Sequence, residues 1–229
     1  MSRMKVSIGL VIVIAQCLLS LVGCGKKEER ITNQGDPILS SIERIPEMIH
    51  SRRWREADRF VYSNICCSIR GIANKEQRVV YTRSYTNLVA RIAPVRVAET
   101  NTAATALNDW RIAMENYCDF VRWGTVLMSE NLDMNPEAWD FLLLPIFLLR
   151  QEIQAHQKRL FDQNVDSRHV EKNAHIQMLD GLLYRCTYEI KRIWYPEAKR
   201  KLAPEQLQQV RQKVKKALGE LPPEMAKDE

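Results

Sequence analysis

LNDWRIAMENYCDFVRWGTVLM, residues 107–128, places apolar or small residues at alternating spacings of three and four. These positions are Leu107, Trp110, Met114, Tyr117, Val121, Gly124 and Met128. A repeat of this kind, continued for three heptads, is typical of a helix that packs along a seam in a helical bundle. The stretch therefore predicts a long helix with one buried side.

Similar apolar stripes occur on both sides of this segment. Before it they run through residues 54–72 and 81–95, and after it through 142–160, 176–193 and 207–218. Prolines stand at or near several boundaries, and Pro145 is predicted to kink an otherwise continuous buried helix. We found no alternating pattern that would indicate a strand. The run FLLLPIFLLR is too short to span a membrane.

These stripes predict an all-α fold, a single helical bundle of about six helices with mostly antiparallel neighbours, over residues 37–218. Gly219 and the Pro222–Pro223 pair are expected to end the last helix, so residues 219–229 are predicted to be a disordered tail. A solenoid of helical repeats is an alternative, supported only by fragments such as WREA and YPEA.

The first residues have the pattern of a secretory signal. Arg3 and Lys5 precede an apolar run over residues 6–22, which is about the shortest length that could cross a membrane. Ser7, Gln16 and Ser20 make this run still less suited to a permanent span. We expect residues 1–23 to be a cleaved signal peptide.

Leu21, Val22, Gly23 and Cys24 follow one another at the end of this run. The combination resembles the lipobox of bacterial lipoproteins. The resemblance implies cleavage before Cys24, a diacylglyceryl group on its sulfur and a fatty acyl chain, such as palmitate, on its amino group. Several acyl chains would anchor the chain firmly to a membrane.

The residues after Cys24 suggest where the anchored protein would reside. Gly25 stands where aspartate would favour retention at the inner membrane, so in a host with two membranes the resemblance implies the outer membrane, on its periplasmic or surface side. Residues 24–36 are rich in charge and turn formers and are expected to form a flexible tether.

The chain has a formal net charge of +6, and much of the excess lies in residues 199–216. We predict a basic contact surface there, consisting of Lys199, Arg200, Lys201, Arg211, Lys213, Lys215 and Lys216. An anionic envelope polymer or an envelope protein is the expected partner. An amphipathic helix with a solvated basic side is the simpler interpretation. No motif for nucleic acid is present.

Four cysteines remain after cleavage and lipidation: Cys66, Cys67, Cys118 and Cys186. An even number in an exported chain is typical of disulfides. Adjacent residues of a helix point about 100° apart, so a bond between Cys66 and Cys67 would strain the helix. We expect one bond from this pair to Cys118 and one to Cys186; four free thiols are the alternative.

Candidate metal ligands are few. Glu152 with His156, and Glu171 with His175, have the spacing E-x-x-x-H, which places both side chains on one side of a helix. The seams supply no further acidic residue, so no metal or cofactor site is predicted. No catalytic motif is present either.

The sequence therefore favours a non-catalytic binding or scaffolding module at the cell envelope. The alternative is an envelope enzyme with a scattered site that acts on peptidoglycan or glycans.

Overall fold

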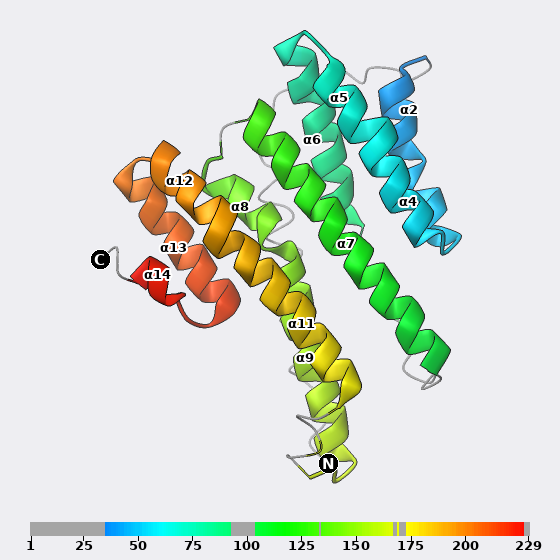
Figure 1. Ribbon diagram of the computed structural model, residues 1–229, viewed down its shortest axis with the longest axis vertical. Helices are drawn as coiled ribbons and strands as arrows, with labels where there is room; N and C mark the ends of the chain where they lie inside the picture. The colour runs from blue at the N-terminus through cyan, green and yellow to red at the C-terminus, as the bar shows by residue number, and fades with distance from the viewer. Residues whose placement is uncertain (1–34, 93–103, 133, 167–168, 170–172, 227–229) are drawn as a thin grey trace, which may run out of the picture. The chain divides into compact units, whose positions relative to one another are not determined.

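A computed structural model describes residues 35–92, 104–132, 134–166, 169 and 173–226 (Figure 1). The chain divides into two units, 1–34 and 35–229, and everything described lies in the second. The expected signal peptide, Cys24 and nearly all of the expected tether lie outside the described residues. The described part is all helical, which confirms the predicted all-α bundle. None of its helices is both long enough and apolar enough to span a membrane.

Three continuous helical stretches form one layer of the unit. The first consists of α4 (Trp54–Phe60), η1 (Val61–Cys66) and α5 (Cys67–Gly71); the second is α7 (Ala104–Asn131); the third consists of α11 (Ala174–Glu189), η2 (Ile190–Trp194) and α12 (Tyr195–Lys201). The segments η1 and η2 are wide π-helical turns inside longer helices.

The contacts in this layer show that its three stretches run in the same direction. Trp110 of α7 packs on His175 of α11, and further along the same helices Cys118 meets Cys186 and Arg122 meets Glu189. On the other side of α7, Tyr62 meets Trp123 and Arg70 meets Glu130. Neighbours within this layer are therefore parallel.

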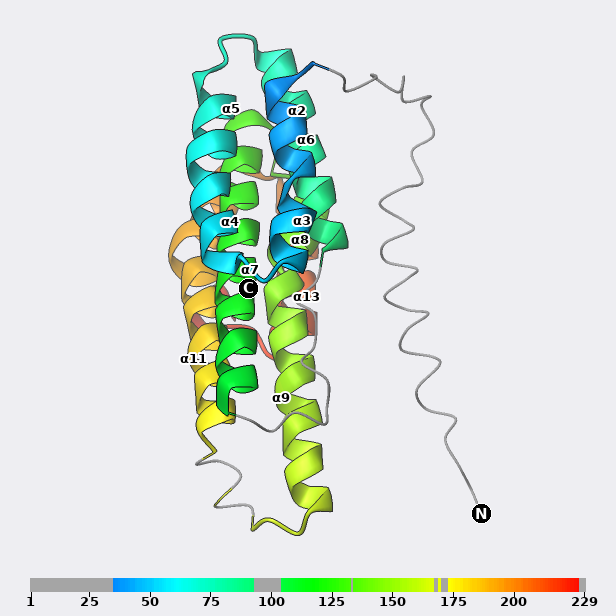
Figure 2. The same cartoon turned by 90° about the vertical axis from the view of Figure 1, so that its right-hand side faces the viewer.

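A second layer lies behind the first, and its helices run in the opposite direction. It contains α6 (Lys75–Arg91), α9 (Leu144–Asp162) and α13 (Pro204–Leu218), with α2 (Pro37–Glu43), α3 (Ile45–His50) and α8 (Pro136–Leu142) beside them (Figures 1 and 2). Each long stretch of the first layer is thus followed by an antiparallel helix of the second. Three helical hairpins stack side by side, an arrangement in the manner of an α-solenoid.

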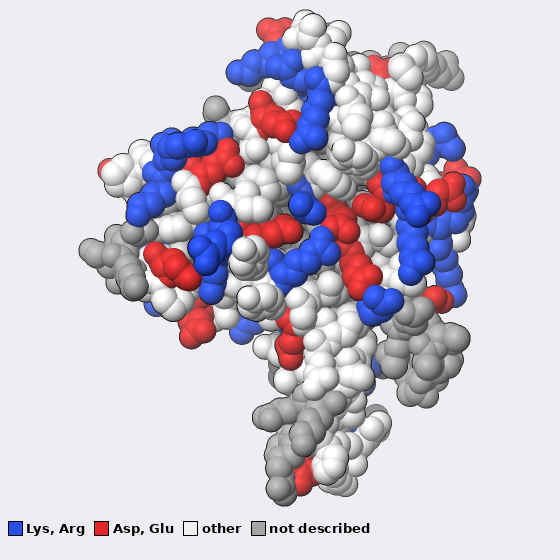
Figure 3. Space-filling view, in the orientation of Figure 1, with Lys and Arg blue, Asp and Glu red and all other residues white. Residues whose placement is uncertain are grey.

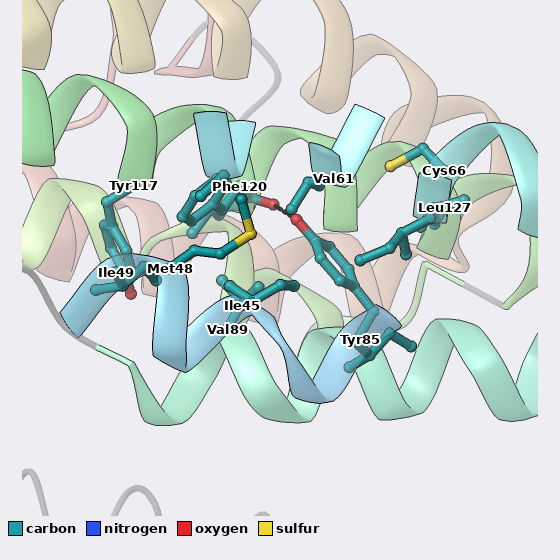
Figure 4. Close-up of a cluster of buried hydrophobic side chains, with 14 of the residues drawn as sticks. Ile45, Met48, Ile49, Val61, Cys66, Tyr85, Val89, Tyr117, Phe120 and Leu127 are labelled. Atoms are coloured by element: carbon teal, nitrogen blue, oxygen red, sulfur yellow. Dashed lines mark hydrogen bonds between the residues drawn. The ribbon is translucent and has the colours of Figure 1, made fainter. Parts of the chain in front are cut away.

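The predicted stripes form the core between these layers. Ala57, Val61, Ile65 and Ile69 are completely buried, and most of the α7 stripe is buried as well. Tyr85 and Phe120 lie at the centre of the largest cluster, where the Tyr85 hydroxyl donates a hydrogen bond to the Phe120 carbonyl oxygen (Figure 4).

The structure adds two short helices and corrects two expectations. Residues 37–50 form α2 and α3, which the stripes did not predict, and Ile45 is fully buried there. The predicted kink at Pro145 is a complete break, because α8 ends at Leu142 and Pro145 lies in the first turn of a new helix. The expected tail at 219–229 contains a short helix, α14 (Pro223–Ala226), which is held in place by the buried Met225.

Candidate functional site

The first layer presents a surface on which charged and aromatic side chains of three helices meet. We call it the three-helix face; it comprises Asp58, Tyr62, Asp119, Arg122, Trp123, Arg185 and Glu189. Figure 3 views this side of the molecule, where basic and acidic side chains alternate across the middle.

Aromatic rings mark one side of the three-helix face. Tyr62 lies in the π-helical turn η1 and packs on Trp123 of α7, with 4.8 Å between the ring centroids. The guanidinium carbon of Arg122 lies 5.6 Å from the centroid of the Trp123 ring. Tyr62 is 46% exposed, so this stack is open to a partner.

An ion-pair network joins α7 to α11 next to these rings. Arg185 pairs with Asp119, and its Nε lies 3.8 Å from Glu189 Oε1. Glu189 Oε1 is also 3.7 Å from Arg122 Nε. These partly buried groups set the register of the two parallel helices and fix the positions of two arginines on the surface.

Asp58 of α4 is a half-buried carboxylate beside this network. Desolvation raises its pKa, the negative charge of Asp119 raises it further, and Trp123 and Arg185 act in the opposite direction. Two neighbouring carboxylates thus have unequal environments, since Asp119 is ion-paired and Asp58 is half-buried.

Exposed tyrosines extend the face along α11. Tyr184 and Tyr188 lie one residue before Arg185 and Glu189, with side chains 72% and 50% exposed. Their ring centroids are 6.4 Å apart, and the guanidinium of Arg192 lies over Tyr188. Contiguous exposed apolar patches are a feature of binding surfaces, and these neighbouring rings make this part of α11 a candidate for one.

The predicted basic surface is divided by the structure. Lys199, Arg200 and Lys201 end α12, whereas Lys215 and Lys216 lie at the far end of α13, about 20 Å away along a helix that rises 1.5 Å per residue. Lys213 Nζ lies 2.6 Å from Asp140 Oδ2. Arg211 was wrongly assigned to a surface, because it is buried beside the Val210 and Val214 stripe.

The two histidines of the E-x-x-x-H pairs meet across α9 and α11. The rings of His156 and His175 are 4.6 Å apart, and His156 Nε2 lies 3.3 Å from Asn173 Oδ1. Burial lowers the pKa of both, that of His175 to about 4. Glu171 lies outside the described residues, and among those described no group of three or more metal-ligating side chains occurs.

The four cysteines are free thiols, and the structure brings two of them together. Cys118 Sγ lies 3.9 Å from Cys186 Sγ. Cys66 is instead buried near Glu130, about 18 Å along α7 from Cys118. Burial raises its pKa to about 12, and Cys67 points to solvent. The expected bonds from Cys66 and Cys67 to Cys118 and Cys186 therefore named the wrong partners.

Sequence reasoning did not find the three-helix face. Its only signal in the sequence is a pair of charged residues beside each of two apolar stripes. Asp119 and Arg122 lie beside the stripe of residues 107–128, and Arg185 and Glu189 lie beside that of residues 176–193. Comparison of the chain with protein-family models, curated proteins and solved structures gives no match.

Proposed function

We propose that this protein is a lipid-anchored bacterial envelope lipoprotein whose helical domain is a binding module for another envelope protein. The anchor is supported by the signal pattern and by the lipobox ending at Cys24. In a host with two membranes we assign it to the outer membrane. The partner would bind on the three-helix face.

One observation carries the choice of surface: exposed tyrosines and arginines are concentrated on the first layer. Tyr62, Tyr184 and Tyr188 are each about half exposed or more, and Arg122 and Arg192 lie over aromatic rings. Tyrosine, tryptophan and arginine are the residues that dominate binding energy in protein interfaces. Stacked helical hairpins commonly use such a layer for binding.

The charge pattern favours a protein over an anionic polymer. The face interleaves three carboxylates, Asp58, Asp119 and Glu189, with its arginines. A uniformly anionic polymer would be repelled by those carboxylates, whereas a protein surface can supply charges of both signs in register. The cationic excess at 199–216 is split between the two ends of α13 and gives no continuous surface of its own.

Site-specific photo-crosslinking in intact cells tests this proposal. A photo-reactive amino acid replaces Tyr184 or Tyr188 in one set of strains. In a matched set it replaces Val80 of α6, which is 43% exposed in the second layer. We expect a discrete adduct with one envelope protein from the tyrosine positions and none from position 80.

Adducts of equal yield from both layers, or none from the tyrosine positions, would refute a partner at the three-helix face. Fractionation of the same cells locates the anchored protein, and recovery in the soluble fraction would refute the anchor.

An envelope enzyme acting on glycans is the second candidate, favoured by one observation. Burial raises the pKa of Asp58, and a carboxyl group with a raised pKa is what serves as the general acid in glycoside hydrolysis, where a second carboxylate, here that of Asp119, is also required. Purified protein incubated with peptidoglycan should then release reducing ends, and Asp58→Asn should abolish the release. Asp109→Asn, outside the face, is the control. No release by the wild type excludes this activity on peptidoglycan.

A further inference from the structure

Two cysteines from different hairpins lie side by side in the first layer. Cys118 belongs to α7 and Cys186 to α11, and their sulfur atoms are 3.9 Å apart. A disulfide has an S–S distance of about 2.05 Å, so the sulfurs need to approach by about 1.9 Å. Small side-chain rotations and a slight shift of parallel helices can supply a movement of this size.

The neighbouring contacts hold the two helices in the register that such a bond requires. Asp119, the residue after Cys118, pairs with Arg185, the residue before Cys186. Two turns before Cys118, Trp110 packs on His175. The Asp119–Arg185 ion pair and the Trp110–His175 contact thus hold the two thiols opposite each other. Neither contact involves a sulfur atom.

We infer that Cys118 and Cys186 are an oxidation site that closes to an intramolecular disulfide, bracing the second helical hairpin to the third. Cys66 and Cys67 take no part, since Cys66 is buried in a different part of the core and Cys67 faces solvent. The inference concerns a modification of the fold and holds whichever partner the three-helix face binds.

The chemistry is thiol–disulfide exchange with an external disulfide as the oxidant. Cys186 is the more accessible of the two, and contact with the Cys118 thiol lowers its pKa, so it forms the thiolate that attacks. Its attack breaks the oxidant's S–S bond, forms a mixed disulfide and expels one thiolate.

Cys118 then completes the reaction. Its sulfur loses a proton and attacks Cys186 Sγ, forming the intramolecular bond and expelling the second thiolate. The two thiol protons end on the two expelled sulfurs. Two electrons pass from the cysteines to the oxidant, which leaves as two thiols.

Peptide mapping after trypsin digestion tests the inference directly, because the four cysteines of the helical domain fall on three separate peptides. Cys118 lies in IAMENYCDFVR, residues 112–122, and Cys186 in CTYEIK, residues 186–191. Cys66 and Cys67 share FVYSNICCSIR, residues 60–70. The protein is incubated with oxidised glutathione, the remaining thiols are alkylated, and the peptides are identified by mass.

We expect the first two peptides to be joined and the third to carry two alkyl groups. Oxidised protein should unfold about 5 to 15 °C above the reduced form. This difference should vanish in Cys186→Ser and persist in Cys67→Ser. Alkylation of both Cys118 and Cys186 after oxidation, or a bond from either one to residues 60–70, would overturn the inference.

Discussion

The phenolic hydroxyl of Tyr85 donates a 2.9 Å hydrogen bond to the main-chain carbonyl oxygen of Phe120. Both side chains are fully buried, so the bond joins α6 to α7 in the core. Tyr85→Phe should lower the free energy of unfolding by about 1 kcal/mol, because it removes a buried hydrogen bond without creating a large cavity. Urea denaturation measures the loss. Tyr188→Phe on the surface should change stability by less than about 0.5 kcal/mol.

Two glycines inside helices should respond oppositely to alanine. A Cβ at Gly124 would lie 2.8 Å from the ring of Phe141 and 3.3 Å from Thr86, whereas nothing lies within 4 Å of one at Gly181. Gly124→Ala should therefore destabilise the fold by about 1 to 3 kcal/mol through overpacking. Gly181→Ala should stabilise it by about 0.5 to 1 kcal/mol, the gain expected inside a helix.

The same denaturation series measures both glycine variants. Phe141→Leu should restore part of the loss in Gly124→Ala by making room for the methyl group. Equal effects of the two alanines would show that α7 does not approach α8 so closely.

The pair of His156 and His175 should make stability depend on pH. Burial lowers the pKa of His175 from 6.5 to about 4, so between these values the unfolded chain binds more protons than the folded one. Stability from this group is complete above about pH 6.5 and is lost as the pH falls toward 4.

His175→Gln should reduce the slope of unfolding free energy against pH over this window. His50→Gln, which removes an exposed histidine of α3, is the matched control. A slope that is unchanged in His175→Gln would contradict the assignment.

The exposed tyrosines that extend the three-helix face along α11 should contribute to partner binding and little to folding. Tyr184→Ala combined with Tyr188→Ala should reduce recovery of the partner at least tenfold, since interface aromatics often contribute 2 kcal/mol or more each. The amount co-purified from solubilised membranes measures the effect. Val80→Ala should leave recovery unchanged, and all variants should unfold at nearly the wild-type urea concentration.

The proposed lipid anchor would depend on Cys24 alone. Cys24→Ala should abolish incorporation of labelled fatty acid, because no other thiol follows a lipobox. Label incorporation by growing cells, read after immunoprecipitation, measures this. Label that persists in the variant would exclude the lipoprotein proposal, and Cys67→Ala is the matched control.

The long helices could be predicted from the sequence because the buried side of a helix requires apolar residues every three or four positions. Ala57, Val61, Ile65 and Ile69 recur every four residues and are all fully buried. The short helices α2 and α3 could not be predicted in this way, since seven and six residues show too little periodicity. The local signals there were Asp36 and Pro37, a helix cap and a first-turn proline, and Pro46 in the first turn of α3.

The arrangement of the site could not be predicted from the sequence either, for a different reason. Asp119 contacts Arg185 only because α7 and α11 run in parallel at one register, which the pattern of neither helix specifies. The partner of Cys118 depends on the same register. The π-helical turns η1 and η2 could not be predicted either, because the spacing of apolar residues does not distinguish a π-helical turn from an α-helix.

The parallel course of the first layer also has an electrical consequence. Three long helices that point the same way add their dipoles, which concentrates partial negative charge where α5, α7 and α12 end. Lys199, Arg200 and Lys201 form the last turn of α12, and Arg70 lies in that of α5. These cations offset part of the shared negative charge, although Arg70 and Lys201 also pair with Glu130 and Glu197. Part of the basic segment therefore has a role within the fold itself.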